Sequence, residues 1–195
     1  MDRVTIVPPN GDDAFEVPYG FWRNHPHRGV DFPDTAAFTT DAVLARRAVE
    51  ALAHFLPAEV EMMVGIDVGG FAFAAALAYR QGLGFIDVRK IGGIRTDVMR
   101  NLAANYHLGD GVAMSKAANV AGKRVALFDD VLISGGTALS SIQLLRRLGA
   151  CCEMAIFVYD IEAMGGRERL EREGVEVRVL KTVPQTIGNV SQAAG

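Results

Sequence analysis

The chain has few cysteines, no surplus of positive charge and no long apolar run. Its two cysteines, Cys151 and Cys152, are adjacent. Adjacent cysteines suit a disulfide poorly, so we expect a protein of a reducing, cytoplasmic compartment. The 20 lysines and arginines are outnumbered by 23 aspartates and glutamates, which argues against nucleic acid as the main partner. Apolar stretches such as Phe71 to Tyr79 are far shorter than the roughly 20 residues that cross a bilayer, so we expect no membrane span.

What the chain does contain points to one α/β domain over residues 1–195. Half of its residues are hydrophobic and 22% are charged, a balance that supports a sizeable core. From residue 41 onward, amphipathic segments alternate with short apolar runs, which is typical of β–α–β units and a mostly parallel sheet. The expected helices span 41–56, 71–81, 137–148 and 167–173, and the expected strands span 62–66, 84–88, 123–128, 154–159 and 175–180.

Three segments depart from this alternation. Residues 1–40 are rich in proline and turn residues, and residues 181–195 form a polar C-terminal tail. Residues 92–122 lack a clean period, and a connection of that length inside a compact domain is usually a functional lid or a small hairpin. We therefore expect a flexible loop at 92–122.

The most informative segment runs from Val125 to Thr137. An apolar strand leads into Asp129 and Asp130, and a Ser-Gly-Gly-Thr turn, 134–137, then opens a helix. Ligands of open α/β sheets bind at the carboxyl ends of the strands. Glycines let the backbone approach a ligand closely, and the first N–H groups of a helix have no partner within the helix. The turn therefore predicts a cradle for a phosphate group.

The acidic pair predicts the other half of the ligand. Carboxylates repel a neighbouring phosphate unless they face a different group, and the vicinal hydroxyls of a sugar can donate hydrogen bonds to them. A Mg²⁺ ion would also reduce the local negative charge. A ribose 5-phosphate satisfies both halves, whereas the plain alternative is two solvated acids at a strand end.

The run from Phe128 to Thr137 resembles the phosphoribosyl diphosphate motif of type I phosphoribosyltransferases. Ile133 stands where that motif more often has a small or hydroxylated residue. Four further segments are similar to those of the adenine-specific members of the family, so the resemblance covers about residues 29–172. These segments are 65–73, 83–90, 106–111 and 166–170.

The resemblance implies a twisted, mostly parallel sheet with helices on both faces, a flexible lid loop at 92–122 and a small N-terminal hood at 1–40. It implies transfer of the 5-phosphoribosyl group from phosphoribosyl diphosphate to a purine-like nucleobase, with adenine favoured, and release of diphosphate. Such enzymes use Mg²⁺, held mainly by the substrate. They are commonly homodimers, because the segment matching Arg89 and Lys90 works beside the neighbouring subunit.

The resemblance also implies roles for individual residues. Asp129 and Asp130 would bind the ribose and serve as further candidate ligands of Mg²⁺. Asp160 would lie near the base, although a helix cap is an equal alternative. The remaining candidates are Ile133, Ser134, Gly135, Gly136 and Thr137 for the 5′-phosphate; Asp67, Val68, Gly69, Gly70, Arg89, Lys90 and Lys116 for the diphosphate; Val30 and Phe32 for the base; and Asp110 as an acid of the catalytic loop.

Three positions depart from the adenine-specific pattern. Gly69 replaces an arginine, Gly109 and Asp110 replace a Glu-Tyr pair, and Pro33 replaces an arginine after Phe32. These losses leave two alternatives open. One is a catalytically weak or inactive regulator that binds phosphoribosyl diphosphate or a nucleotide, and the other is a phosphoribosyltransferase for a different base.

Overall fold

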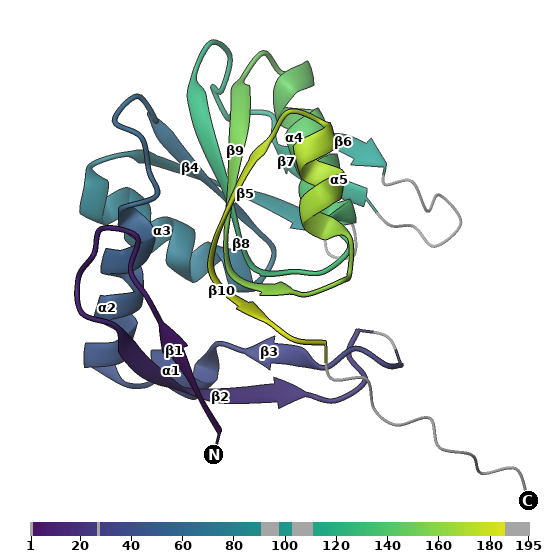
Figure 1. Ribbon diagram of the computed structural model, residues 1–195. Coiled ribbons are helices and arrows are strands. Elements are labelled where there is room, and N and C mark those ends of the chain that lie inside the picture. Colours follow the sequence, from purple (N-terminus) through teal and green to yellow (C-terminus); the bar gives the residue numbers. More distant parts are fainter. Residues whose placement is uncertain (1, 27, 91–97, 103–110, 186–195) are drawn as a thin grey trace, which may run out of the picture.

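The computed structural model describes residues 2–26, 28–90, 98–102 and 111–185. They form two sheets and five helices, drawn in Figure 1. In chain order the elements are β1 (Asp2–Ile6), β2 (Phe15–Trp22), β3 (Phe32–Asp34), α1 (Ala36–Thr39), α2 (Ala42–Ala53), β4 (Met62–Ile66), α3 (Gly69–Gln81), β5 (Gly84–Lys90), β6 (Val98–Leu102), β7 (Gly111–Ser115), β8 (Arg124–Leu132), α4 (Gly136–Arg147), β9 (Cys151–Ile161), α5 (Gly166–Arg172) and β10 (Glu176–Val183).

The main sheet has seven strands in the order β10-β9-β8-β4-β5-β7-β6. Strands β10, β9, β8, β4 and β5 are parallel, and β7 pairs antiparallel with both β5 and β6. Helices α2 and α3 pack with one buried cluster and α4 and α5 with the other, so both faces of the sheet are covered. This arrangement confirms the expected α/β fold with a mostly parallel sheet.

Local sequence signals explain several boundaries. Helix α2 begins where the Asp41 carboxylate accepts hydrogen bonds from the N–H groups of Val43 (2.8 Å) and Leu44 (3.1 Å), which is typical of an N-cap. Helix α3 ends at Gly82, which adopts φ 68° in the left-handed region that favours glycine. Both features match the helices predicted from the sequence.

Residues 1–40 hold more regular structure than their prolines suggested. Strands β1, β2 and β3 form an antiparallel sheet, here called the hood sheet, which lies against the end of β10 (Figure 1). Its apolar face, with Ile6, Phe15 and Val17, belongs to the same buried cluster as β9. The sequence did not predict these short strands, because their prolines suggested turns. Prolines at edge and end positions of a strand do not prevent pairing.

Two other boundaries differ from the expected ones. Strand β10 continues to Val183, three residues into the expected tail, because its last residues pair with β9 up to Ile161. The described parts of the expected loop at 92–122 contain the antiparallel pair of β6 and β7. Among the described residues, no helix has both the length and the hydrophobicity needed to cross a membrane.

Candidate active site

The sequence had suggested that the acidic pair follows the end of a strand. In the structure both residues lie inside β8. Strand β8 loses its β4 partner after Phe128 but stays paired with β9 as far as Leu132. The N–H of Asp130 donates to Asp129 Oδ1 (3.0 Å), and the N–H of Val131 donates to Asp130 Oδ1 (2.9 Å). These local bonds hold both carboxylates beside the carboxyl end of β4.

Burial raises the pKa of Asp129 well above its ordinary value, and the neighbouring Asp130 raises it further. Burial is also the main cause that raises the pKa of Asp130. Lys90 at the end of β5 acts in the opposite direction on both carboxyl groups. The pair therefore favours a neutralising partner, such as a hydroxyl donor or a cation.

The segment Asp67–Gly70 packs directly on this acidic pair. A Cβ atom added at Gly69 would overlap the carboxylate of Asp130, and one at Gly70 would lie 2.6 Å from the carbonyl oxygen of Phe128. At Gly70 the neighbour is backbone, so only glycine permits this approach, whereas at Gly69 the neighbour is a side-chain carboxylate. The Asp67–Val68 peptide bond is cis, and the Val68 side chain is 75% exposed. The structure thus brings the candidate diphosphate segment and the candidate ribose residues together.

The candidate phosphate turn follows β8 as expected. Gly135 takes the N-cap position of α4 with φ 71°, in the left-handed region, and no described side chain caps the helix. The first-turn amides of α4 are therefore left open to a ligand. Ser134 is exposed, and Ile133, Gly136 and Thr137 are partly exposed at the same turn.

A glycine of α5 supports this turn from behind. A Cβ added at Gly135 would come within 3.0 Å of the Gly166 carbonyl oxygen, and one at Gly166 would overlap the carbonyl oxygen of Ile133. In the sequence, Gly166 belongs to a segment that resembles the family, and no role could be predicted for it from its position. A glycine opening a short charged helix was the available signal, but nothing local says which backbone it touches.

The candidate cations differ in their placement. Arg89 and Lys90 end β5 and are exposed; Arg89 forms an ion pair with Asp87, and its guanidinium lies 5.3 Å from the centroid of the Phe71 ring. Strand β7 runs antiparallel to β5 with Val112 opposite Lys90. Lys116 follows the other end of β7, and its role toward the diphosphate stays a prediction.

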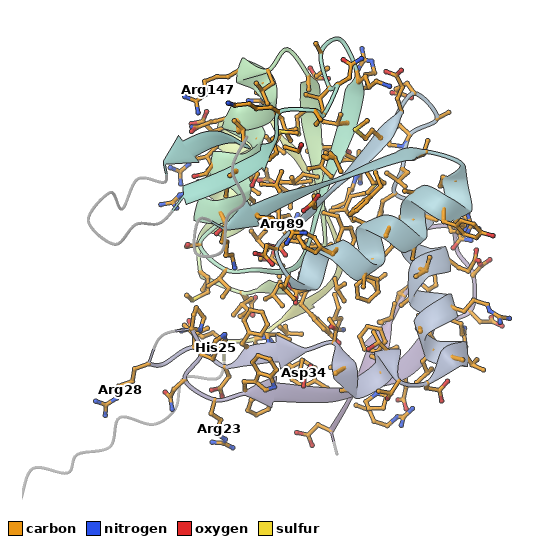
Figure 2. The ribbon with its side chains drawn as sticks, turned by 180° about the vertical axis from the view of Figure 1, so that it is seen from behind. Arg23, His25, Arg28, Asp34, Arg89 and Arg147 are labelled. Atoms are coloured by element: carbon orange, nitrogen blue, oxygen red, sulfur yellow. The ribbon has the colours of Figure 1, made fainter. Side chains whose placement is uncertain are left out.

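The base-side candidates lie between the hood sheet and the end of β9. Val30, which precedes β3, is buried. Phe32, the first residue of β3, is half-buried. Phe32 stacks against Trp22, with 6.0 Å between the ring centroids, and packs edge-on to His25. Figure 2 shows Asp34 on the hood sheet and His25 in the connection between β2 and β3, with Arg89 on the main body above them. Asp110 lies outside the described residues.

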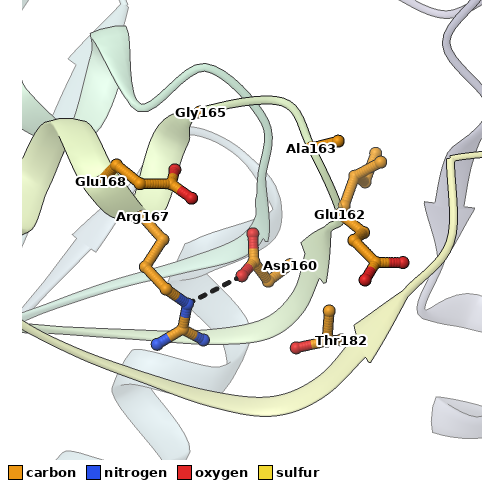
Figure 3. Close-up of a pocket in the computed structure, with 8 residues that line it drawn as sticks. Asp160, Glu162, Ala163, Gly165, Arg167, Glu168 and Thr182 are labelled. Carbon is orange, nitrogen blue, oxygen red and sulfur yellow. Dashed lines mark hydrogen bonds and ion pairs between the residues drawn. The ribbon is translucent and has the colours of Figure 1, made fainter.

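Asp160 has a structural partner rather than a helix to cap. It is 6% exposed, and its Oδ2 accepts a hydrogen bond from Arg167 Nε (3.1 Å). The N-cap of α5 is Gly165, which leaves the cap alternative unsupported. Asp160 and Arg167 line a cavity of about 170 Å³ at the ends of β9 and β10, shown in Figure 3. Burial raises the pKa of Asp160 even though Arg167 lowers it.

Comparisons with known proteins agree with this geometry. A family model described as the phosphoribosyl transferase domain matches residues 40–193. The adenine phosphoribosyltransferase of a Chelativorans strain is 38% identical over 159 residues, which cover 80% of this chain and 87% of that enzyme.

Solved structures share the fold. The adenine phosphoribosyltransferase of Rhodothermus marinus superposes with a TM-score of 0.78 at 29% identity, covering 85% of this chain and 94% of that one. The Giardia lamblia enzyme, solved with 9-deazaadenine, superposes with a TM-score of 0.75 at 26% identity, covering 85% and 93%. The protein therefore has the type I phosphoribosyltransferase fold, and it belongs to the phosphoribosyltransferase family of pentosyl-transferring enzymes.

Proposed function

We propose that this phosphoribosyltransferase transfers the 5-phosphoribosyl group of phosphoribosyl diphosphate to adenine and releases diphosphate. The observation that carries the proposal is the close approach of Gly69 and Gly70 to Asp129 and Asp130, just before the uncapped first turn of α4. Adenine is supported by the similarity to enzymes named adenine phosphoribosyltransferase, one of them solved with 9-deazaadenine. The same relatives do not favour a non-catalytic regulator.

Each part of the substrate has a proposed place. The amides at the start of α4, with Ser134 and Thr137, bind the 5′-phosphate, because the helix N-terminus carries partial positive charge. Asp129 and Asp130 accept hydrogen bonds from the ribose hydroxyls. The backbone of 67–70 binds the diphosphate next to them.

The reaction breaks the bond between C1 of the ribose and the diphosphate oxygen and forms a bond from C1 to a purine nitrogen. Negative charge accumulates on the departing diphosphate, so positive groups directed at it lower the barrier. Arg89 and Lys90 supply such charge from the end of β5. The arginine that Gly69 replaces is absent from this set, which places more of the task on these two side chains.

Magnesium fits the same site. Carboxylate oxygens are ligands that Mg²⁺ prefers, and the raised pKa of the acidic pair indicates that a cation would be favourable there. Among the described residues, no cluster of three or more ligating side chains forms a dedicated metal cage. Asp129 and Asp130 would therefore hold an ion carried mainly by the substrate, and that ion would neutralise charge on the diphosphate.

We also propose a homodimer in the cytoplasm. Phe85 on β5 is 40% exposed, and strand β5 continues to Arg89 and Lys90. An interface along β5 would cover this apolar side chain on the strand that carries the candidate cations. The free thiols of Cys151 and Cys152 support a reducing compartment. Light scattering on the purified protein tests the dimer against the 20.9 kDa chain.

The main experiment offers the protein a panel of purines and pyrimidines with phosphoribosyl diphosphate and Mg²⁺, and follows diphosphate release. We expect turnover with adenine and little with guanine, hypoxanthine or uracil. Turnover with another base alone would refute adenine as the acceptor. Binding of phosphoribosyl diphosphate without turnover of any base would refute the catalytic proposal.

A second experiment tests the ribose contact. The double variant Asp129→Asn, Asp130→Asn should lose phosphoribosyl diphosphate binding, measured by calorimetry, because two charged acceptors are removed. The matched control is Asp12→Asn, Asp13→Asn, an adjacent and exposed pair between β1 and β2. Unchanged affinity in the first double variant would contradict the assigned contact.

A further inference from the structure

Tyr159 in β9 is buried in an unusual way. Its exposed fraction is 0%, and it sits between Val131 of β8 and Lys181 of β10 in the sheet register. Among the described residues, its hydroxyl is the one buried side-chain polar atom without a hydrogen-bond partner. A buried unsatisfied hydroxyl costs about 1–3 kcal/mol, so a folded chain usually keeps one only where another role requires it.

Two residues of the hood sheet, Tyr19 and Asp34, lie near the Tyr159 side chain. The Tyr159 ring meets Tyr19 of the hood sheet edge-on, with 5.9 Å between the centroids. Asp34 of β3 is close enough for its charge to raise the pKa of Tyr159, after burial as the larger cause. Both Asp34 oxygens are already engaged, Oδ2 by the Trp22 indole N–H (3.1 Å) and Oδ1 by the Ala36 N–H (2.9 Å).

The position of Tyr159 relates it to the substrate. Its partner Val131 lies two residues beyond Asp129 on β8, on the side that leads to the hood sheet. The candidate base residues Val30 and Phe32 belong to or pack against the same buried cluster as Tyr159 and Val131. The hydroxyl remains protonated at neutral pH, because burial and the Asp34 charge both disfavour the phenolate.

We propose that the Tyr159 hydroxyl is a specificity-determining group that donates a hydrogen bond to the unprotonated N1 of adenine. The inference rests on the proposed transfer to adenine and adds a residue that selects the base. Adenine presents an unprotonated N1, whereas the oxo-purines carry a proton there, so a donor in this place favours adenine. The hydroxyl is sealed from water, so the base has to displace part of the hood sheet. Tyr19, half-buried and against the Tyr159 ring, is placed to move.

The test uses Tyr159→Phe, which keeps the ring and removes only the hydroxyl. We expect the KM for adenine to rise about tenfold, with the KM for phosphoribosyl diphosphate unchanged, as loss of one hydrogen bond predicts. The matched control is Tyr79→Phe on α3, where the side chain is 92% exposed. Steady-state kinetics and the melting temperature are measured for both variants.

Adenine analogues sharpen the test. With 1-deaza-, 3-deaza- and 7-deazaadenine, the wild-type protein and Tyr159→Phe should behave alike only for 1-deazaadenine, which lacks the bonded nitrogen; equal behaviour with another analogue instead would overturn the assignment to N1. An unchanged KM for adenine in Tyr159→Phe overturns the inference, whether the melting temperature rises, as for a purely packed ring, or falls, as for a hydroxyl satisfied by water. If the wild-type protein itself does not turn over adenine, the proposed function fails first, and the two failures are distinguished.

Discussion

The two glycines against β8 should respond very differently to the same substitution. In Gly70→Ala, the new methyl group would lie 2.6 Å from the Phe128 carbonyl oxygen and 3.1 Å from Asp129 Cα, both backbone atoms of a paired strand. In Gly69→Ala, the overlap involves only the carboxylate group of Asp130. A side-chain end can rotate away, whereas a paired backbone cannot.

These contacts set the magnitude. Overpacking against a rigid neighbour costs about 1–3 kcal/mol, and replacing glycine by alanine in a helix returns about 0.5–1 kcal/mol. Gly70→Ala should therefore lower the free energy of unfolding by about 1–2 kcal/mol, while Gly69→Ala should leave it unchanged or slightly higher. For a chain of this size the difference corresponds to a gap of about 2–8 °C in melting temperature.

Thermal unfolding by circular dichroism measures this gap, and the KM for phosphoribosyl diphosphate measures the second effect. In Gly69→Ala the Asp130 carboxylate has to leave its place, so this KM should change while the melting temperature does not. Equal destabilisation in both variants would refute the reasoning. So would a Gly69→Ala protein that melts lower than Gly70→Ala.

Two further predictions follow from buried or capping carboxylates. Because the pKa of Asp129 is raised in the folded state, the folded protein binds more protons than the unfolded chain above the ordinary pKa, and stability falls as pH rises through that window. Asp129→Asn removes this loss, so urea unfolding between about pH 4 and about pH 8 should show the variant gaining stability over wild type as pH rises; parallel curves would contradict the assignment. Asp41→Ala removes the acceptor of two N-terminal amides of α2 and should cost about 1 kcal/mol, or about 2–4 °C in melting temperature. Asp41→Asn should largely keep the wild-type melting temperature. An Asp41→Ala protein with the wild-type melting temperature would show that the cap contributes nothing to stability.

Most of the secondary structure could be predicted because its signals are local. The parallel strands β4, β5, β8, β9 and β10 and the helices α2 and α3 follow from hydrophobic period, capping chemistry and glycine conformation within a few residues. The turn before α4 could be predicted for the same reason, since strand, acid pair and glycine turn are contiguous. The hood sheet could not be predicted, because its strands are short and lie among prolines, which by themselves indicate turns and do not show that the flanking residues pair.

The sequence alone was enough to identify the acidic pair of β8, the turn before α4 and the family that they resemble. It could not place Gly69 against Asp130, set Gly166 against the turn before α4, or leave the Tyr159 hydroxyl without a hydrogen-bond partner among the described residues. Each of those facts joins elements far apart in the chain, and such contacts depend on how the sheets, helices and hood sheet pack together. Spacing and periodicity describe one element at a time, so they carry no record of which backbone a distant glycine or hydroxyl will meet.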